Sequence, residues 1–289
     1  MKTWKIRLAI LLGILAAACL AVCGYMLVEQ ANLFIKPTPT PANTPPIDMD
    51  VPHVEDFIPV GSGLEQGKLH VCWVPAANAN APTFLYLHGQ THNNSTHPEH
   101  AKRLHQLGYN VLMVDYRGFG KSSGGGKPTE AKLYEDAAAA WNYLTQKREP
   151  QPQHIFIYGH SLGAAIAVEL TTHHPDAAGL VAESAFTTAP EIAKHTYPYL
   201  PTGLLLRLRF DSLQRVRTLK VPLLLIHGTQ DEKVPFTMSK ELYAAAPKPK
   251  KLLLIERAGH ANCPEVGGVE YDAAVTTFVQ TQLNRSIGQ

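Results

Sequence analysis

The pentapeptide Gly159-His160-Ser161-Leu162-Gly163 (GHSLG) fits the pattern GxSxG, and its flanks decide the fold. An apolar run at residues 155–158 precedes it, and the helix-like stretch AAIAVEL at 164–170 follows it. This order predicts a strand, a sharp turn and a helix. The glycines let strand and helix pack closely, and the serine hydroxyl is exposed at the edge of a sheet. A bare GxSxG is as common in structural turns, so the flanks carry this prediction.

The composition is that of an ordinary globular protein. Of the 289 residues, 17% are charged and 45% are hydrophobic, and the formal net charge is +2. Because this charge is small and the basic residues are scattered, we do not expect a nucleic-acid partner. Four cysteines are present, and Cys72 and Cys263, which lie outside the N-terminal apolar segment, allow one disulfide without requiring it.

Residues 1–30 are predicted to form a transmembrane anchor or a signal segment. Three basic residues precede an uncharged run, residues 8–28, which is long enough to cross a bilayer as a helix. The positive-inside rule then places the N-terminus in the cytoplasm and the later chain outside it, as in a single-pass membrane protein. The alternative is a secreted or lipid-anchored protein, because residues 16–18 are all alanine and Cys19 or Cys23 offers a lipid acceptor.

Residues 31–53 are predicted to form a proline-rich stalk. The segment PTPTPANTPP, residues 37–46, has five prolines and no large apolar side chain. Such a segment favours an extended, polyproline-like conformation. At about 3.1 Å per residue it would hold the next domain roughly 30 Å from the membrane.

Residues 54–289 are predicted to form one α/β domain. Short apolar runs alternate with amphipathic stretches, which is typical of a mostly parallel central sheet with helices on both faces. Strands are expected near residues 68–74, 83–88, 110–115, 154–158, 179–183, 221–227 and 251–256. Helices are expected near residues 97–107, 129–147, 162–173, 237–246 and 270–283.

The longest interval between strands, about 187–220, is expected to form a small cap over the site. Within it, Leu204, Leu205 and Leu208 have the spacing of one helix face. We expect them to pack on the core. The alternative is an apolar lip for an acyl chain or for a membrane surface.

A serine nucleophile needs a base, and the base needs an acid that holds its tautomer. Asp231 follows the apolar strand that ends in HG, and His260 lies in a loop after the last strand, so we expect Ser161, Asp231 and His260 to form a catalytic triad. Glu183, which also ends a strand, is the alternative acid. The oxyanion hole is expected to be formed by the backbone amides of Leu162 and Gln90.

At this point the sequence resembles the α/β-hydrolase superfamily and, within it, the Bem46-like or ABHD13-like serine hydrolases. The matching stretches are FLYLHGQ (84–90), NVLMVDYRGFGKSSG (110–124), IYGHSLGAAIA (157–167), ESAF (183–186), FDSL (210–213), VPLLLIHGTQDEKVP (221–235) and AGHAN (258–262). Members are often anchored by one N-terminal segment and act as esterases or thioesterases, so the resemblance implies hydrolysis of acyl substrates. One departure concerns the second oxyanion donor: many relatives have HGN and a small-residue loop, whereas HGQ here leads into THNNSTH.

Histidines are frequent between residues 88 and 105, at positions 88, 92, 97, 100 and 105. A histidine-rich tract can bind metal, but no carboxylate or cysteine completes a recognised ligand spacing here. We therefore expect a solvated loop and helix face, and no metal or cofactor. His160, next to the nucleophile, is expected to line the pocket or to support the backbone.

These observations predict a membrane-tethered serine hydrolase that cleaves carboxylic esters or thioesters through an acyl-enzyme, with a small-molecule or lipid-like acyl substrate. Serine at the turn argues against epoxide hydrolases and dehalogenases, which use a carboxylate nucleophile. Two alternatives stay open. One is an amidase or peptidase with the same fold, and the other is a catalytically silent, membrane-anchored binding module.

Overall fold

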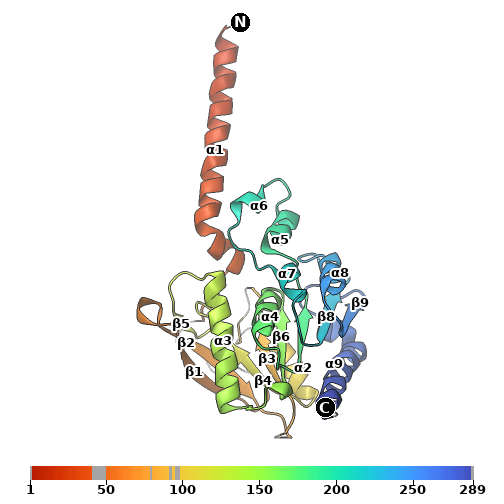
Figure 1. Cartoon of the computed structure of the whole chain (residues 1–289). Coiled ribbons are helices and arrows are strands. Elements are labelled where there is room, and N and C mark those ends of the chain that lie inside the picture. The colour runs from red at the N-terminus through yellow and green to blue at the C-terminus, as the bar shows by residue number, and fades with distance from the viewer. Residues whose placement is uncertain (1, 41–49, 79, 91–92, 95–97, 288–289) are drawn as a thin grey trace.

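The computed structural model describes residues 2–40, 50–78, 80–90, 93–94 and 98–287 (Figure 1). Within them, nine strands form one sheet in the order β1-β2-β4-β3-β6-β7-β8-β9, and β5 pairs with β2. The strands are β1 (Val54–Val60), β2 (Gly67–Val74), β3 (Thr83–Leu87), β4 (Asn110–Val114), β5 (Ser123–Gly124), β6 (Ile155–His160), β7 (Gly179–Glu183), β8 (Leu223–Gly228) and β9 (Lys250–Ile255). All pairs from β4 to β9 are parallel, and β1, β2 and β5 form an antiparallel edge. This confirms the predicted mostly parallel α/β fold.

Helices cover both faces of the sheet. Successive strand residues point to opposite faces, and here the residues on both faces are apolar and need to be buried. Leu85 and Ile157 face the core under α3 (Glu130–Lys147), α4 (Leu162–His173), α7 (Ser212–Val216) and α8 (Phe236–Ala245). Their neighbours Phe84 and Phe156 face the core under α2 (Glu99–Gln106) and α9 (Cys263–Ile287). Two short 3₁₀ turns, η1 (Gly63–Glu65) and η2 (Pro152–His154), precede β2 and β6. The sheet is therefore buried on both sides, which accounts for the continuous apolar runs in its sequence.

Each of the seven strands expected from the sequence is present, whereas β1 and β5 were missed. The sequence of β1, VEDFIPV, contains two acids and a proline, and β1 lies at the edge of the sheet, where such residues are tolerated. The last helix, α9, begins seven residues before its predicted start at residue 270 and is interrupted at Gly268, which has φ 46°.

The N-terminal helix α1 runs over Lys2–Ile35, five residues beyond the predicted segment end at residue 30. Residues 3–35 are long and apolar enough to cross a membrane. The helix ends just before Pro37, which cannot continue a helical hydrogen-bond pattern. The chain then lies against the domain, because the Thr40 amide donates to the Gly120 carbonyl (2.7 Å) and the Gly120 amide to the Thr38 carbonyl (3.0 Å). Residues 37–40 therefore do not extend away from the domain as the stalk prediction implied, and 41–49 lie outside the described residues.

The interval expected to be a cap contains α5 (Ala189–Thr196), α6 (Thr202–Leu205) and α7. Figure 1 shows α5 and α6 beside the base of α1, on the side of the sheet from which α1 projects. The prediction that three leucines share one helix face and pack on the core was wrong in part. Because α6 ends at Leu205, Leu208 is buried in the core while Leu204 is 85% exposed.

The two cysteines of the domain are free thiols. Cys72 lies in β2 and Cys263 begins α9, and both are buried. Burial raises the pKa of the Cys72 thiol to about 12. The disulfide that the sequence allowed is not formed.

Candidate active site

Ser161 occupies the turn between β6 and α4 in a conformation that serine rarely adopts, with φ 56° and ψ −115°. The two glycines of the motif make this turn possible. A Cβ atom on Gly159 would lie 2.2 Å from the carbonyl oxygen of Gly163, and a Cβ atom on Gly163 would lie 2.0 Å from that of Leu87. Since backbone atoms cannot move aside cheaply, both positions require glycine. The strained turn holds the Ser161 hydroxyl beyond the carboxyl end of β6.

The structure brings together the three residues expected to form the triad. Ser161 follows β6, Asp231 follows β8 and His260 follows β9, so all three lie at the same edge of the parallel sheet. His260 Nδ1 lies 2.8 Å from Asp231 Oδ2, and His260 Nε2 lies 2.9 Å from Ser161 Oγ. Ionised Asp231 can only accept, so His260 donates from Nδ1, and its Nε2 is left to accept the serine proton.

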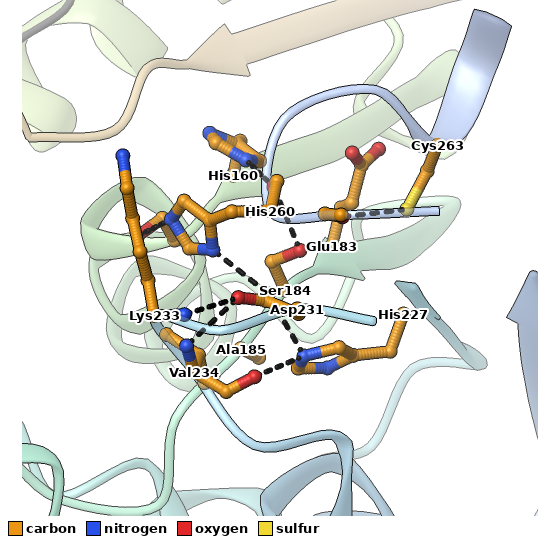
Figure 2. A network of polar contacts seen from close by, with 12 residues as sticks. His160, Glu183, Ser184, Ala185, His227, Asp231, Lys233, Val234, His260 and Cys263 are labelled. Carbon is orange, nitrogen blue, oxygen red and sulfur yellow. Dashed lines mark hydrogen bonds and ion pairs between the residues drawn. The ribbon is translucent and has the colours of Figure 1, made fainter. Parts of the chain in front are cut away.

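Asp231 is held as an anion by several donors (Figure 2). The Lys233 and Val234 amides donate to its Oδ1 (2.9 and 2.8 Å), and His227 Nε2 lies 3.1 Å from Oδ2. Burial opposes ionisation, but the hydrogen bonds from His227, His260 and Val234 outweigh it and lower the pKa of Asp231. His227 was missed in the sequence because it looked like one more residue of a buried strand.

The backbone of His260 is fixed by two side chains beneath it. His160 Nε2 donates to the His260 carbonyl (2.8 Å), and Ser184 Oγ donates to the same oxygen (3.0 Å). Burial lowers the pKa of His160 to about 3, so this ring is neutral at pH 7 and donates from Nε2. This confirms the expectation that His160 supports the backbone. Ser184 was missed, and Figure 2 shows it below the His260 loop.

Glu183, the alternative acid, belongs to a separate buried network. Its Oε1 lies 3.1 Å from His100 Nε2, and it also accepts a hydrogen bond from the Tyr158 hydroxyl. Burial would raise the pKa of Glu183, but the charge and hydrogen bond of His100 outweigh it and lower the pKa to about 2. Glu183 pairs with His100, whereas Asp231 is the carboxylate that contacts the His260 imidazole.

The histidine-rich tract does not form the solvated surface that we expected. His92 and His97 lie outside the described residues, but His88 and His100 are buried. Potential ligand atoms of His100, His160 and Glu183 lie within 4.8 Å of one another and could hold a metal ion. Glu183 and His100 already pair, and His160 donates to the His260 carbonyl, so we assign these groups to the support of the active-site loops.

Both residues expected to supply the oxyanion amides line the cavity that contains Ser161. Leu162 is the first residue of α4, where a backbone amide has no partner within its own helix. Gln90 follows β3, the strand next to β6, and its side chain donates to the Phe34 carbonyl of α1. Leu162 and Gln90 line the same cavity as Ser161 and His260.

This cavity has a volume of about 480 Å³, and part of its wall was not expected from the sequence. Leu33 and Phe34 of α1 contribute to the lining together with Phe186 and with Ile192 of α5, and the Phe34 and Phe186 rings meet edge-on with centroids 6.0 Å apart. The charged residues of its lining are Lys36, Lys233 and Glu232. The site is thus a pocket of mixed polar and apolar lining, with Ser161 in its wall and a slight excess of positive charge.

Comparisons with known proteins agree with this architecture. The model of a family described as serine aminopeptidase, S33, matches residues 79–209. An uncharacterized protein of Mycobacterium tuberculosis is 34% identical over 291 residues, covering 98% of this chain and 99% of the relative. The alpha/beta hydrolase domain-containing protein 17B of Xenopus laevis is 32% identical over 182 residues, or 62% of this chain and 59% of that protein. Among solved structures, the esterase Pf2001 of Pyrococcus furiosus superposes with a TM-score of 0.68 at 22% identity, covering 85% of this chain and 96% of the esterase.

Proposed function

The chain belongs to the α/β-hydrolase superfamily, and from this premise we propose that it is a membrane-tethered serine hydrolase that cleaves carboxylic esters or thioesters through an acyl-enzyme. The observation that carries the proposal is the hydrogen-bonded series Ser161, His260 and Asp231, with distances of 2.9 and 2.8 Å. A serine hydroxyl in such a series can lose its proton to imidazole as it attacks a carbonyl carbon.

The proposed reaction has two stages. Ser161 Oγ attacks the acyl carbon while His260 Nε2 takes its proton, and the Leu162 and Gln90 amides stabilise the oxyanion. Collapse of this intermediate breaks the acyl bond to oxygen or sulfur, and His260 protonates the leaving alcohol or thiol. Water then attacks the acyl-enzyme with His260 again as base, releasing the acid and restoring Ser161. Asp231 keeps the imidazole in the required tautomer and stabilises the imidazolium.

Cleavage of an amide or peptide bond is the second candidate, because the matching family model is described as serine aminopeptidase. An aminopeptidase must recognise a positively charged amino group, which a carboxylate would favour. Here the lining has one acid, Glu232, and two lysines, Lys36 and Lys233. This balance favours a neutral or anionic acyl substrate over a free N-terminus.

We further propose that residues 1–30 anchor the chain with the N-terminus in the cytoplasm, that the domain of residues 54–289 acts outside it, and that residues 187–220 cap the site. The apolar helix Thr3–Ile35, with Lys5 and Arg7 near its start, supports this arrangement. A sequence tag at either end, probed with protease in intact and permeabilised cells, tests the orientation. Protection of the N-terminal tag alone in intact cells is expected, and protection of the C-terminal tag would contradict it.

The test of function uses the full-length chain in detergent micelles. The parent is assayed with 4-nitrophenyl esters, acyl thioesters and aminoacyl 4-nitroanilides, and is labelled with a fluorophosphonate. Ser161→Ala should abolish ester hydrolysis and labelling, whereas Ser123→Ala, an exposed serine in β5, should retain both. Faster cleavage of anilides than of esters would favour the peptidase, and a folded parent that neither labels nor hydrolyses any substrate would favour the binding module.

A further inference from the structure

The C-terminal end of α1 packs against the α/β domain. Ile35 is fully buried, and the Phe34 ring stacks on Phe210 with centroids 5.8 Å apart. Gln30, itself 8% exposed, accepts a hydrogen bond from the Arg207 amide at 2.6 Å. These contacts fix the last turns of the helix against the segment that follows α6, so α1 has a defined position relative to the site.

A second, smaller cavity adjoins the active-site cavity between α1 and the cap. Its volume is about 70 Å³, against about 480 Å³ for the cavity that contains Ser161. The two share four lining residues, Leu33, Phe34, Ala193 and Tyr197. The smaller cavity is further lined by Met26, Gln30, Thr202, Leu205 and Leu206. It therefore extends the active site along α1 toward the N-terminus.

The position of these residues along α1 gives their depth relative to a bilayer. The uncharged run ends at Val28, and Met26 lies within it. Leu33 is five residues beyond Val28, or about 7.5 Å along the helix axis at about 1.5 Å per residue. A bilayer's headgroup layer is about 5–7 Å thick on each side. With residues 8–28 in the hydrocarbon core, the smaller cavity lies at the hydrocarbon boundary, and Leu33, which both cavities share, lies at the outer edge of the headgroup layer.

The cap surface next to the smaller cavity has the composition of a surface that contacts a membrane. Tyr199, which precedes α6, is 97% exposed, and Leu204, within α6, is 85% exposed. Figure 1 shows α6 beside the base of α1. Arg207 and Arg209, also exposed, follow α6. Tyrosine, leucine and arginine together are typical of a surface at the interface of an anionic membrane.

We propose that the site takes its acyl chain directly from the bilayer, through the passage between the last turns of α1 and the cap helices α5 and α6. This inference rests on the proposed function. The substrate class is an ester or thioester whose hydrocarbon chain resides in the membrane. The hydrocarbon chain lies along Leu33, Phe34 and Leu205, and the carbonyl group reaches Ser161 at the outer edge of the headgroup layer. In this arrangement α1 is a wall of the substrate site as well as an anchor.

The first test uses a matched pair of leucine-to-tryptophan substitutions. Leu205→Trp fills the smaller cavity, whereas Leu64→Trp adds the same side chain at a fully exposed position of η1 that lines neither cavity. Full-length protein in phosphatidylcholine vesicles is assayed with 4-methylumbelliferyl palmitate and 4-methylumbelliferyl butyrate. Each buried methylene is worth about fourfold in binding, so excluding two or three should lower the palmitate-to-butyrate ratio of kcat/KM at least tenfold in Leu205→Trp. In Leu64→Trp the ratio should stay within twofold of that of the parent. Retained fluorophosphonate labelling shows that a variant is folded, and an unchanged ratio in labelled Leu205→Trp overturns the inference.

The second test needs no substitution. Protein and palmitate ester are placed either in the same vesicles or in separate vesicles that are then mixed. Direct uptake from the surrounding bilayer predicts hydrolysis at least tenfold faster when both share a bilayer, and equal rates would overturn it. If butyrate is hydrolysed but palmitate hydrolysis is equally fast in shared and in separate vesicles, this inference alone is overturned. A parent that hydrolyses neither ester and does not label overturns the proposed function as well.

Discussion

Replacing Asp231 with asparagine keeps the shape of the side chain but removes the acceptor that faces His260. In the parent, Oδ1 accepts from two backbone amides and Oδ2 from His260 and His227. An asparagine that keeps the two backbone hydrogen bonds must direct its NH₂ group at His260. His260 Nδ1 can then only accept, so its proton moves to Nε2, the atom 2.9 Å from Ser161 Oγ. The imidazole is left in a tautomer that cannot take the serine proton.

The expected cost of Asp231→Asn is a fall in kcat of about 10⁴-fold, the size seen when a triad acid loses its charge but not its shape. This corresponds to about 5.4 kcal/mol of transition-state stabilisation. The assay is hydrolysis of 4-nitrophenyl butyrate at pH 8 by full-length protein in micelles, with circular dichroism as the check of folding. Glu183→Gln is the matched control, because Glu183 also ends a strand but pairs with His100, and its loss of kcat should be at least 100-fold smaller. Asp231→Asn within tenfold of the parent, or a larger effect of Glu183→Gln, would refute the assignment of the acid.

Two further predictions concern the turn at Ser161 and the buried His160 next to it. Gly163→Ala places a Cβ atom 2.0 Å from the Leu87 carbonyl oxygen and should prevent folding. In the control Gly203→Ala the added Cβ atom has no other atom within 4 Å, so this variant should fold. Equal yields of the two folded proteins in detergent would contradict the prediction. His160 has a pKa lowered by burial from 6.5 to about 3, so below about pH 6.5 the unfolded chain binds a proton that the folded chain does not, and stability falls as the pH falls. The melting temperature should therefore decline from pH 6.5 to 4.5 less in His160→Gln than in the parent, and identical declines would argue against a neutral, buried His160.

The sequence predicted the residues whose position depends on local pattern. Ser161 lies in a strand-turn-helix motif, and Asp231 and His260 each follow an apolar strand, so their chain positions place them at one edge of a parallel sheet. The residues that hold them in place could not be predicted in this way. His227 looks like a strand residue and Ser184 like a loop residue. Their roles follow from contacts with Asp231 and His260, which are 4 and 76 residues away in the chain and adjacent only in the fold.

The cap shows a second limit of pattern analysis. Leu204, Leu205 and Leu208 have helical spacing, yet α6 ends at Leu205 and the next residue, Leu206, is extended. Gln30 contributes to this end, since its side-chain oxygen accepts from the Arg207 and Leu208 amides at 2.6 and 3.3 Å. A residue almost 180 positions earlier thus contributes to the local structure of this segment. The end of α6 could not be predicted from the spacing of apolar residues within the segment itself.

A second contact of α1 suggests a further role for the N-terminal segment. In the sequence, its apolar run and the prolines after it indicate an anchor and a spacer, two parts with no chemical role. In the structure, Gln90, an expected oxyanion residue, donates from its side chain to the Phe34 carbonyl of α1. A movement of α1 would therefore displace Gln90, the residue proposed to supply the second oxyanion amide. Because this contact joins the proposed anchor to the proposed active site, the rate of hydrolysis should depend on the thickness of the surrounding bilayer.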